Sequence, residues 1–363
     1  MRLRLATIAI PFRIDPFVLS LLGVVLGATL LPCRDTSASV FKALGIVAIA
    51  AMFFLQGARL SRDAIVNGIT HWRLHAVISA TTFVSFPIIG LGLSVLFPTL
   101  LPPSLWLGVL FVCALPSTVQ SSIALTSLAQ GNVAGAVCSA TASNLAGIVL
   151  TPLIFGLLSR AHGAGVRLEG IGQVVGQLLL PFGVGHLLRS WVGNWVENHR
   201  AVLSITDRSS ILLVVYVAFS AAVAHGVWHQ LPPATLLVLG VVLALVLAGV
   251  LILIRFASVA IGLGQQDEIA ATFCGSQKSL VSGVPIASAL FSSAVIGPVL
   301  IPIMIYYPMQ IVTCAWLAKR ALVAKNGDSR LPLQPQPEIG VGQRDELGTG
   351  VAGVPEYSDS QLR

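Results

Sequence analysis

Two short polar stretches lie inside segments that are otherwise apolar. They are ALPSTVQSSIALTS at residues 114–127 and FCGSQKSLVSGVP at residues 273–285. Each combines hydroxyl side chains and a glutamine with residues that interrupt helices, which are Pro116 in the first stretch and Gly275, Gly283 and Pro285 in the second. A backbone group freed from its helix in lipid costs several kcal/mol unless protein or trapped water pairs with it. Such stretches therefore predict broken helices whose ends line a buried cavity for a solute or an ion.

The two stretches together favour a binding site more strongly than any single residue does. Gln120 and Gln277 carry large amides that helix packing alone does not favour. Isolated hydroxyl side chains, in contrast, are common contacts between membrane helices, so packing is their better interpretation when each is taken singly. These isolated hydroxyls are Thr126, Ser127, Ser139 and Ser143.

Lys278 places a charge inside a segment expected to cross a membrane, and no acidic residue lies inside an expected span to neutralise it. A charge at the bilayer centre costs at least about 2.5–3.5 kcal/mol, so such a residue normally faces a cavity and has a function. Lys278 could be a counter-charge for an anionic solute, occupy the place of a coupling cation, or carry a proton. The alternative is that its side chain snorkels to the membrane surface. Asp267 and Glu268 oppose that alternative, because they already mark the surface about three turns earlier.

The composition is that of a membrane protein. Of the 363 residues, 55% are hydrophobic and 10% are charged, against about 25% charged in an average soluble domain. A helical span needs about 20 apolar residues, and the uncharged runs predict an all-α integral membrane protein with ten spans. The expected spans are residues 16–33, 40–58, 74–97, 104–129, 131–158, 170–189, 209–229, 234–258, 267–291 and 293–318.

The ten segments divide into two halves of five. GIVLTPLI at residues 147–154 and GPVLIPIM at residues 297–304 share the pattern Gly-x-Val-Leu-x-Pro, and each polar stretch lies one segment before it. An odd number of spans inserts the second half upside down, which is the inverted repeat of secondary transporters. The expected organisation is a cytoplasmic N-terminal lead-in (1–13), a first five-helix repeat (14–160), a second, inverted five-helix repeat (161–322) and a disordered cytoplasmic tail (323–363).

The net charge of +7 follows from membrane topology. If both termini are cytoplasmic, most basic residues near the spans face the cytoplasm, as the positive-inside rule favours. The exceptions on the other face are Arg34, Lys42, Arg160 and Arg167. Basic residues at helix rims do not indicate a nucleic-acid partner, and no protease, paired-aspartate or nucleophile-elbow pattern indicates an enzyme. The five cysteines form no Cys-x-x-Cys pair, so no metal cluster or disulfide framework is expected.

Four motifs carry a family resemblance that runs along nearly the whole of residues 14–320. They are FLQGARLS at 54–61, LPSTVQSSIALTSLAQGN at 115–132, FCGSQKSLVSGVP at 273–285 and LIPIMIYYPMQI at 300–311. Through them the chain resembles the bile acid:sodium symporter family, and within it the branch related to member 7 of the solute-carrier family of bile-acid transporters.

The resemblance implies ten helices in two inverted five-helix repeats, which form a panel domain and a core domain. The fourth and ninth helices are then discontinuous and cross in the core, and transport proceeds by movement of core against panel. The residues expected to bind solute or ion are Thr118, Gln120, Ser121, Ser122, Ser139, Thr141, Ser143, Asn144, Ser276, Gln277, Lys278 and Ser279. Among these, the sodium candidates are Ser121, Ser122, Thr141 and Gln277.

Two positions depart from the sodium-coupled members of the family. Those members place a glutamate where this chain has Phe273, and Ser-Asn where it has Ser122 and Ile123. A carboxylate is the strongest attraction that a protein offers a hard cation. Coupling to Na+, to H+ or to no ion therefore stays open, and no other cofactor is expected.

The expected function is a secondary transporter that moves a small organic, anionic solute across the plasma membrane, or the inner membrane of a bacterium. The alternative is a non-transporting membrane regulator of calcium or lipid handling with the same fold. The sequence identifies neither the solute nor the oligomeric state.

Overall fold

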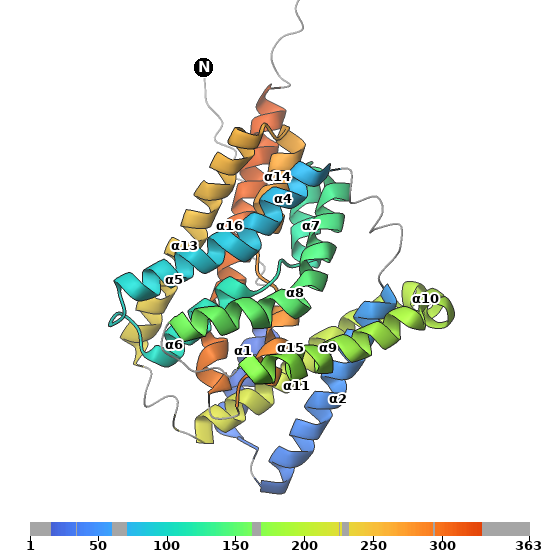
Figure 1. Cartoon of the computed structure of the whole chain (residues 1–363), viewed down its shortest axis with the longest axis vertical. Coiled ribbons are helices and arrows are strands. Elements are labelled where there is room, and N and C mark those ends of the chain that lie inside the picture. The colour runs from blue at the N-terminus through green and yellow to red at the C-terminus, as the bar shows by residue number, and fades with distance from the viewer. Residues whose placement is uncertain are drawn as a thin grey trace, which may run out of the picture. The chain divides into compact units, whose positions relative to one another are not determined.

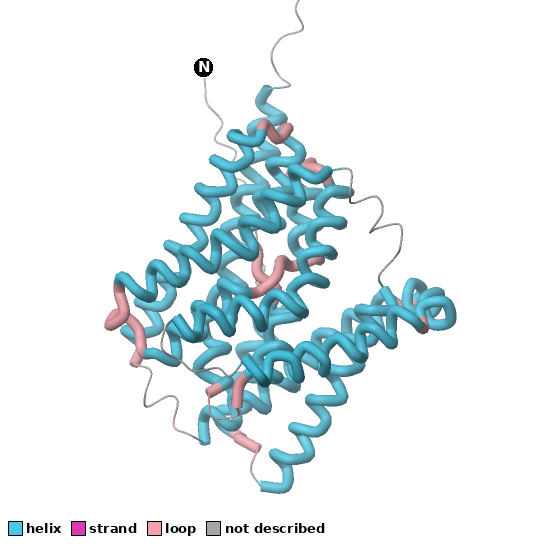
Figure 2. Tube along the Cα trace, viewed as in Figure 1, coloured by secondary structure: helices cyan, strands magenta, loops and turns pink. Residues whose placement is uncertain are grey.

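Helices form the regular structure in the part of the chain that the computed structural model describes (Figure 1, Figure 2). That part comprises residues 16–33, 35–59, 71–161, 168–224, 226, 232–292 and 295–328. In chain order, the elements are α1 (Pro16–Leu30), α2 (Asp35–Arg59), α4 (Trp72–Ala80), the π-helix η2 (Thr81–Ser85), α5 (Phe86–Leu96), α6 (Pro103–Ala114), α7 (Gln120–Leu128), α8 (Val133–Ala161), α9 (Leu168–Leu187), α10 (Arg189–Asn198), α11 (Arg200–Ala224), α13 (Pro233–Ile261), α14 (Gln265–Ser276), α15 (Leu280–Leu290) and α16 (Ile296–Asp328).

Six helical segments are long and apolar enough to cross a bilayer, as expected of a multi-pass membrane protein. They are Ser37–Arg59, Trp72–Leu96, Val133–Arg160, Ala201–Ala224, Pro233–Ile261 and Ile296–Leu322. Three further apolar helices are shorter, namely Pro16–Leu30, Pro103–Ala114 and Leu178–Leu187. The count of ten spans, the inverted repeat and the division into panel and core stay predictions.

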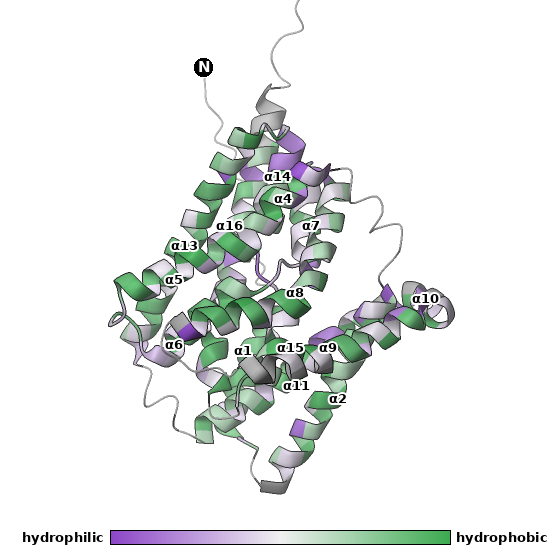
Figure 3. Cartoon of the chain, viewed as in Figure 1, coloured by the Kyte–Doolittle hydropathy of each residue, from purple (hydrophilic) through white to green (hydrophobic). Residues whose placement is uncertain are grey.

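Helix α13 shows how the apolar surface is distributed. One face exposes a stripe of large apolar side chains, which are Leu237, Val241, Leu245, Ile252 and Phe256. The opposite face is buried against α14 and α5, through residues such as Leu239, Leu243 and Val250. Figure 3 shows the hydrophobic colour running along α13 and α5. In water such a stripe would promote association, so we assign this face to the hydrocarbon of the membrane.

Two helices are interrupted at the predicted polar stretches. The helical conformation stops at Leu115–Val119, between α6 and α7, and again at Gln277–Ser279, between α14 and α15. Pro116 lies in the first break, as expected. The second break contains no expected helix breaker, because Gly275 lies inside α14 and both Gly283 and Pro285 lie inside α15. Side chains of α16 pair with the backbone of the second break instead.

A third irregularity, not predicted, lies in the long helix Trp72–Leu96. Its middle forms one turn of π-helix, in which Phe86 N donates to Thr81 O, five residues earlier. In that register the carbonyl of Thr82 would pair with the nitrogen of Pro87, which carries no hydrogen. The oxygen of Thr82 is therefore left free for another donor.

Helices α2 and α9 pack with their backbones unusually close. A Cβ atom added at Gly57 of α2 would collide with the carbonyl of Phe182, and one added at Gly185 of α9 would collide with the carbonyl of Phe54. The two glycines thus allow reciprocal close approach, as small residues commonly do between membrane helices. This pair of helices forms part of one wall of the candidate site.

Some boundaries differ from the prediction. α10 was not expected and lies in the stretch between two predicted spans. α11 begins nine residues before the expected start at 209, because its first turns are polar and were assigned to a loop. α16 continues to Asp328, into the segment expected to be a disordered tail. Residues 329–363 lie outside the described part of the chain.

Candidate functional site

The two breaks lie against each other in the interior of the bundle, where Figure 2 shows short non-helical segments. Ser279 N donates to Pro116 O at 2.9 Å, which joins the backbones of the two breaks directly. The hydroxyl of Ser117 donates to the carbonyl of Cys274 at 2.5 Å. Segments about 160 residues apart in the sequence are therefore held together by a backbone hydrogen bond and by the hydroxyl of Ser117.

Several backbone groups freed at the first break are paired with a side chain or with the other break. Thr151 Oγ1 donates to Ala114 O at 2.9 Å, and Ser143 Oγ accepts from Ser117 N at 3.1 Å. Both side chains belong to α8. Ser143, a predicted binding residue, thus has a structural partner, which agrees with the packing interpretation of isolated hydroxyls.

The second break is paired in the same way. The amide of Gln310 in α16 binds both backbone groups of Lys278, because its Oε1 accepts from Lys278 N at 2.7 Å and its Nε2 donates to Lys278 O at 3.0 Å. Tyr306, one turn earlier in α16, donates its hydroxyl to Ser276 O at 2.9 Å. Two side chains of one helix therefore replace the helical hydrogen bonds that α14 and α15 lack.

Lys278 binds the carbonyl oxygens freed at two other irregular points. Its Nζ donates to the carbonyls of Leu115 (2.7 Å), Thr82 (2.9 Å) and Cys113 (3.1 Å). The first and last are C-terminal carbonyls of α6, where the helix dipole favours a cation. An ammonium group has three N–H bonds, and here it has three acceptors.

The ammonium group of Lys278 also lies 3.9 Å from the centre of the Phe86 ring, close enough for a cation–π interaction. The side chain is fully buried. The snorkelling alternative is therefore wrong in this structure, because the ammonium group points to buried carbonyls and not to the membrane surface.

A cluster of hydroxyl groups surrounds the side chain of Gln277. Gln277 Oε1 accepts from Ser121 Oγ (2.6 Å), Thr118 Oγ1 (2.7 Å) and Ser122 Oγ (3.2 Å). Three of the four sodium candidates, Ser121, Ser122 and Gln277, are thus brought together. The fourth, Thr141, lines the neighbouring cavity from α8. The cluster offers a cation only uncharged oxygen atoms, which suit a hard cation but attract it weakly.

A cavity of about 550 Å³ lies beside the crossing. One wall contains the first residues of α7 and α15, from Gln120 and from Leu280 onward, together with Thr141 and Asn144 of α8. Because half-helices begin at this wall, their positive dipole ends lie at the cavity. The other wall comes from α1, α2, α9 and α11, with residues that include Phe17, Gln56, Phe182 and Asp207. Tyr307 of α16, the helix that binds the second break, completes the lining.

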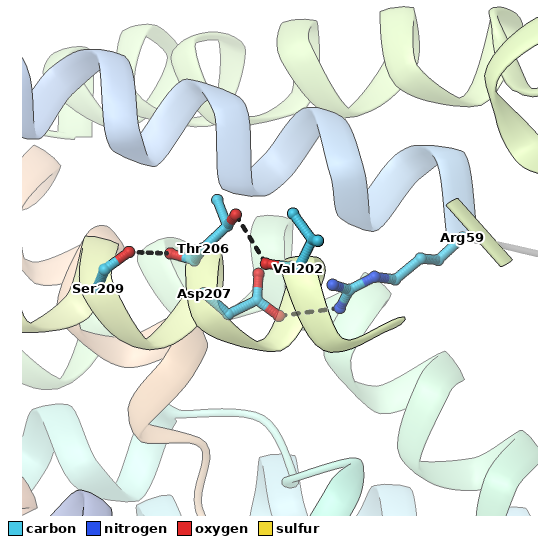
Figure 4. A network of polar contacts seen from close by, with 5 residues as sticks. All are labelled: Arg59, Val202, Thr206, Asp207 and Ser209. Carbon is cyan, nitrogen blue, oxygen red and sulfur yellow. Dashed lines mark hydrogen bonds and ion pairs between the residues drawn. The ribbon is translucent and has the colours of Figure 1, made fainter. Parts of the chain in front are cut away.

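Three charged side chains line the cavity among the residues that the structure describes, namely Arg59, Asp207 and Arg208. Arg59, at the end of α2, pairs with Asp207 of α11 at 2.9 Å between Nη1 and Oδ2 (Figure 4). Asp207 Oδ1 is buried and has no hydrogen-bond partner in the described part of the chain. Arg208 lies over the ring of Phe17, 5.6 Å from its centre.

Asp207 corrects one sequence-based expectation. No acid was expected inside a span, but Asp207 lies within the candidate span Ala201–Ala224 and is only 6% exposed. Its carboxylate is therefore a buried acid at the cavity, and the pairing with Arg59 offsets the cost of burying it.

The predicted site residues fall into two groups. Those that line the cavity are Thr118, Gln120, Ser121, Thr141, Asn144 and Ser279. Those that lie behind it or elsewhere, and are not among its lining residues, are Ser122, Ser139, Ser143, Ser276, Gln277 and Lys278. Ser139 contacts His75 Nδ1 at 2.7 Å, and Ser276 donates to Thr272 O at 2.6 Å. Asn144 accepts from Ser282, a cavity residue that was not predicted.

A helical bundle in which two interrupted helices meet beside a cavity of about 550 Å³ is typical of a multi-pass membrane transporter. Residues 15–322 match the family described as the SBF-like CPA transporter family (DUF4137). The chain belongs to this family, and its expected resemblance to the bile acid:sodium symporters is confirmed.

Several relatives are similar along most of the chain. The "Putative symporter YfeH" of Escherichia coli is 48% identical over 310 residues, which cover 85% of this chain and 93% of that protein. "Uncharacterized protein PA2026" of Pseudomonas aeruginosa is 50% identical over the same coverage. "Sodium/bile acid cotransporter 7" of Mus musculus is 27% identical over 270 residues, covering 73% of this chain and 79% of that protein. The names that state a function are those of transporters, which fits the expectation that the chain is not an enzyme.

Proposed function

We propose that the protein is a secondary transporter that carries an organic anion across the membrane by alternating access. The observation that carries the proposal is the cavity at the crossing. Its volume of about 550 Å³ lies within the range of pockets that hold drug-sized ligands. Family membership supports the transport activity, and the lining residues support the charge of the solute.

The cavity favours an anion from both walls. The N-terminal ends of α7 and α15 supply partial positive charge on one wall, and no side chain caps α7. Arg59 and Arg208 supply two full positive charges on the other wall, against the single negative charge of Asp207. An anion between the walls would therefore contact both sets of helices at once.

Alternating access is supported by the way in which the walls are assembled. The wall with α7, α8 and α15 is fastened by the hydrogen bonds of the crossing, including those from α16, whereas the wall with α2 and α11 carries the Arg59–Asp207 pair. Each wall is thus held internally by polar contacts. We propose that the two walls move against each other while the solute stays bound at the crossing.

We further propose that Lys278 takes the place of a coupling cation. Three carbonyl oxygens at 2.7–3.1 Å and an aromatic face are the groups that would otherwise attract a free cation. Lys278 is not among the cavity-lining residues, which favours the cation surrogate over a direct counter-charge to the solute. Phe273 stands where sodium-coupled members of the family have a glutamate, and the absence of that carboxylate also favours the cation surrogate.

The charge of the solute can be tested by thermal stability in detergent. We expect cholate below its micellar concentration to raise the melting temperature, and its uncharged amide to raise it less. Cholate is the first probe because relatives are named as bile-acid cotransporters. Arg208→Gln should weaken cholate binding about tenfold, or about 1.4 kcal/mol.

The matched control is Arg73→Gln. Arg73 also lies over an aromatic ring, 5.7 Å from the centre of Trp72, but is not among the cavity residues. Equal loss of binding in both variants, or equal stabilisation by cholate and its amide, would count against an anion site at the cavity.

Uptake into proteoliposomes tests whether the protein transports the anion that it binds. The purified protein should accumulate or exchange a radiolabelled organic anion that it binds, and Arg208→Gln should slow uptake. A protein that binds anions but moves none of them would fit the non-transporting regulator instead.

A further inference from the structure

A second cavity, of about 250 Å³, is lined by helices that also line the first cavity. Its walls come from α2, α9, α11, α15 and the start of α16. Lys42 is the charged residue among its described lining residues, and Ser288 and Ser292 are the hydroxyl residues. The second cavity is therefore mainly apolar, with one positive charge.

On two helices, the two cavities are lined by residues toward opposite ends of the helix. On α2, Lys42 lines the second cavity and Arg59 lines the first, which places them about 25 Å apart along the helix. α2 contains the candidate span Ser37–Arg59, so the two residues lie near its opposite ends. On α15, the first turn lines the first cavity, and Ser288 near the other end lines the second.

The helix segments between the cavities are short. On α11, Arg208 lines the first cavity and Val214 the second, a separation of about 9 Å. On α9, Phe182 and Leu178 line the first and second cavities, about 6 Å apart. On α2, α9, α11 and α15 the nearest lining residues of the two cavities are thus about one to two turns apart. On the fifth shared helix, α16, about three turns separate Ile296 from Tyr307.

The side chains in those segments that are fully buried are apolar, and we call the layer that they form the septum. Its fully buried side chains include Met52 and Phe53 of α2, Ile211 of α11, and Val284 and Ile286 of α15. All five belong to the main hydrophobic core. A charged solute cannot cross such a layer without losing its hydration, so the septum separates the two cavities in this state.

We infer that the second cavity is the far vestibule of the solute path, which the septum closes in this state and which opens toward the other face of the membrane. This inference rests on the proposed transport function. Lys42 gives the vestibule the same preference for anions as the first cavity, because its ammonium group is the lining charge there. Relative movement of α15 against α2 and α11 would open the septum and join the first cavity to the vestibule.

Cysteine labelling from the two faces of the membrane tests the inference. Thr141→Cys reports on the first cavity and Ser288→Cys on the second, each in a background where the partly exposed Cys33 and Cys138 are replaced. A membrane-impermeant thiol reagent is applied to right-side-out and to inside-out vesicles. We expect the two cysteines to be labelled preferentially from opposite faces.

The matched control is Ser220→Cys, on α11. Ser220 is fully buried and is not among the lining residues of either cavity, so its cysteine should resist labelling from both faces. Labelling of Ser288→Cys from the same face as Thr141→Cys, or from neither face, would overturn the inference. That result would leave the anion-binding test at Arg208 unaffected, so the two failures can be told apart.

The charge of the vestibule is tested with the same cysteine. An anionic methanethiosulfonate should react with Ser288→Cys faster than a cationic one, after normalisation to a free thiol. Adding Lys42→Gln should lower this rate ratio by about threefold to tenfold at low salt. An unchanged ratio would remove the anion preference from the inference.

Discussion

At the scale of single residues, the ammonium group of Lys278 is surrounded by carbonyl oxygens, as a bound cation would be. Its ammonium group satisfies carbonyl oxygens from α6 and from the π-helical turn, and it receives no carboxylate in return. Removal of the side chain would leave three buried acceptors unpaired, and each such acceptor costs about 1–3 kcal/mol. The lysine therefore joins three irregular segments of backbone.

We expect Lys278→Ala to lower the free energy of unfolding by several kcal/mol. We also expect the stability of this variant to depend on sodium. The truncated side chain leaves a space that is lined by carbonyl oxygens, which Na+ can occupy. The melting temperature of the variant in detergent should rise with NaCl and less with choline chloride, whereas that of the wild-type protein should respond equally to both.

The control for this comparison is Lys42→Ala, whose exposed side chain should leave stability and the response to sodium unchanged. Sodium-specific stabilisation of the wild-type protein that survives Lys278→Ala would show that the ion has a place of its own. Lys278 would then not be its surrogate.

Asp207 lowers the net positive charge of the side chains that line the first cavity. Asp207→Asn removes its negative charge and leaves Arg59 without an ionic partner. We expect cholate to bind about threefold to tenfold more tightly to this variant at low salt, with a smaller gain at high salt because ions screen the interaction. Isothermal titration at two salt concentrations measures both effects. Asp267→Asn, which alters a carboxylate outside the cavity, should bind cholate as the wild-type protein does.

At the scale of elements, the broken helices could be predicted from the sequence because polar and helix-breaking residues gather inside apolar runs. Their exact ends could not. The second break falls at Gln277–Ser279 because Gln310 and Tyr306, about 30 residues away, bind its backbone. Gly283 and Pro285, which predicted a break, are accommodated within α15.

The close approach of α2 and α9 gives a prediction for a single helix. Gly185→Ala should destabilise the protein by about 1–3 kcal/mol, because the added methyl group meets the carbonyl of Phe54 and separates the helices. Gly183→Ala, two residues earlier on α9, meets no atom within 4 Å and should be neutral or slightly stabilising. The melting temperatures of both variants, measured by thermal unfolding, test this prediction. Equal melting temperatures would mean that the helices have room to separate.

Two site features escaped prediction for physical reasons. The π-helical turn at Thr81–Ser85 has no periodic signature, so the free carbonyl of Thr82 could not be anticipated. Asp207 and Arg208 were assigned to a loop because α11 begins with polar turns, although these turns face a cavity. In the membrane interior, polarity indicates a buried cavity as readily as a loop.

At the scale of the whole molecule, the two cavities relate to the predicted topology. With both termini cytoplasmic, Arg59 and Arg208 lie on the cytoplasmic side and Lys42 on the other side. We expect green fluorescent protein fused at the C-terminus or after Leu263 to fluoresce, and alkaline phosphatase fused after Thr99 to be active. The opposite pattern of activity would reverse the orientation of both cavities.

Lys278 also bears on the direction in which a solute can flow. A cation that is covalently part of the chain is released on neither side, so it contributes no ion gradient to transport. If no other ion is coupled, an anion responds only to its own concentrations and to the membrane voltage. Each negative charge gains about 2.3 kcal/mol per 100 mV on leaving a cell that is negative inside, which corresponds to roughly a fiftyfold concentration ratio. Under that voltage, a transporter whose ion site is permanently occupied by a lysine side chain would export its anion.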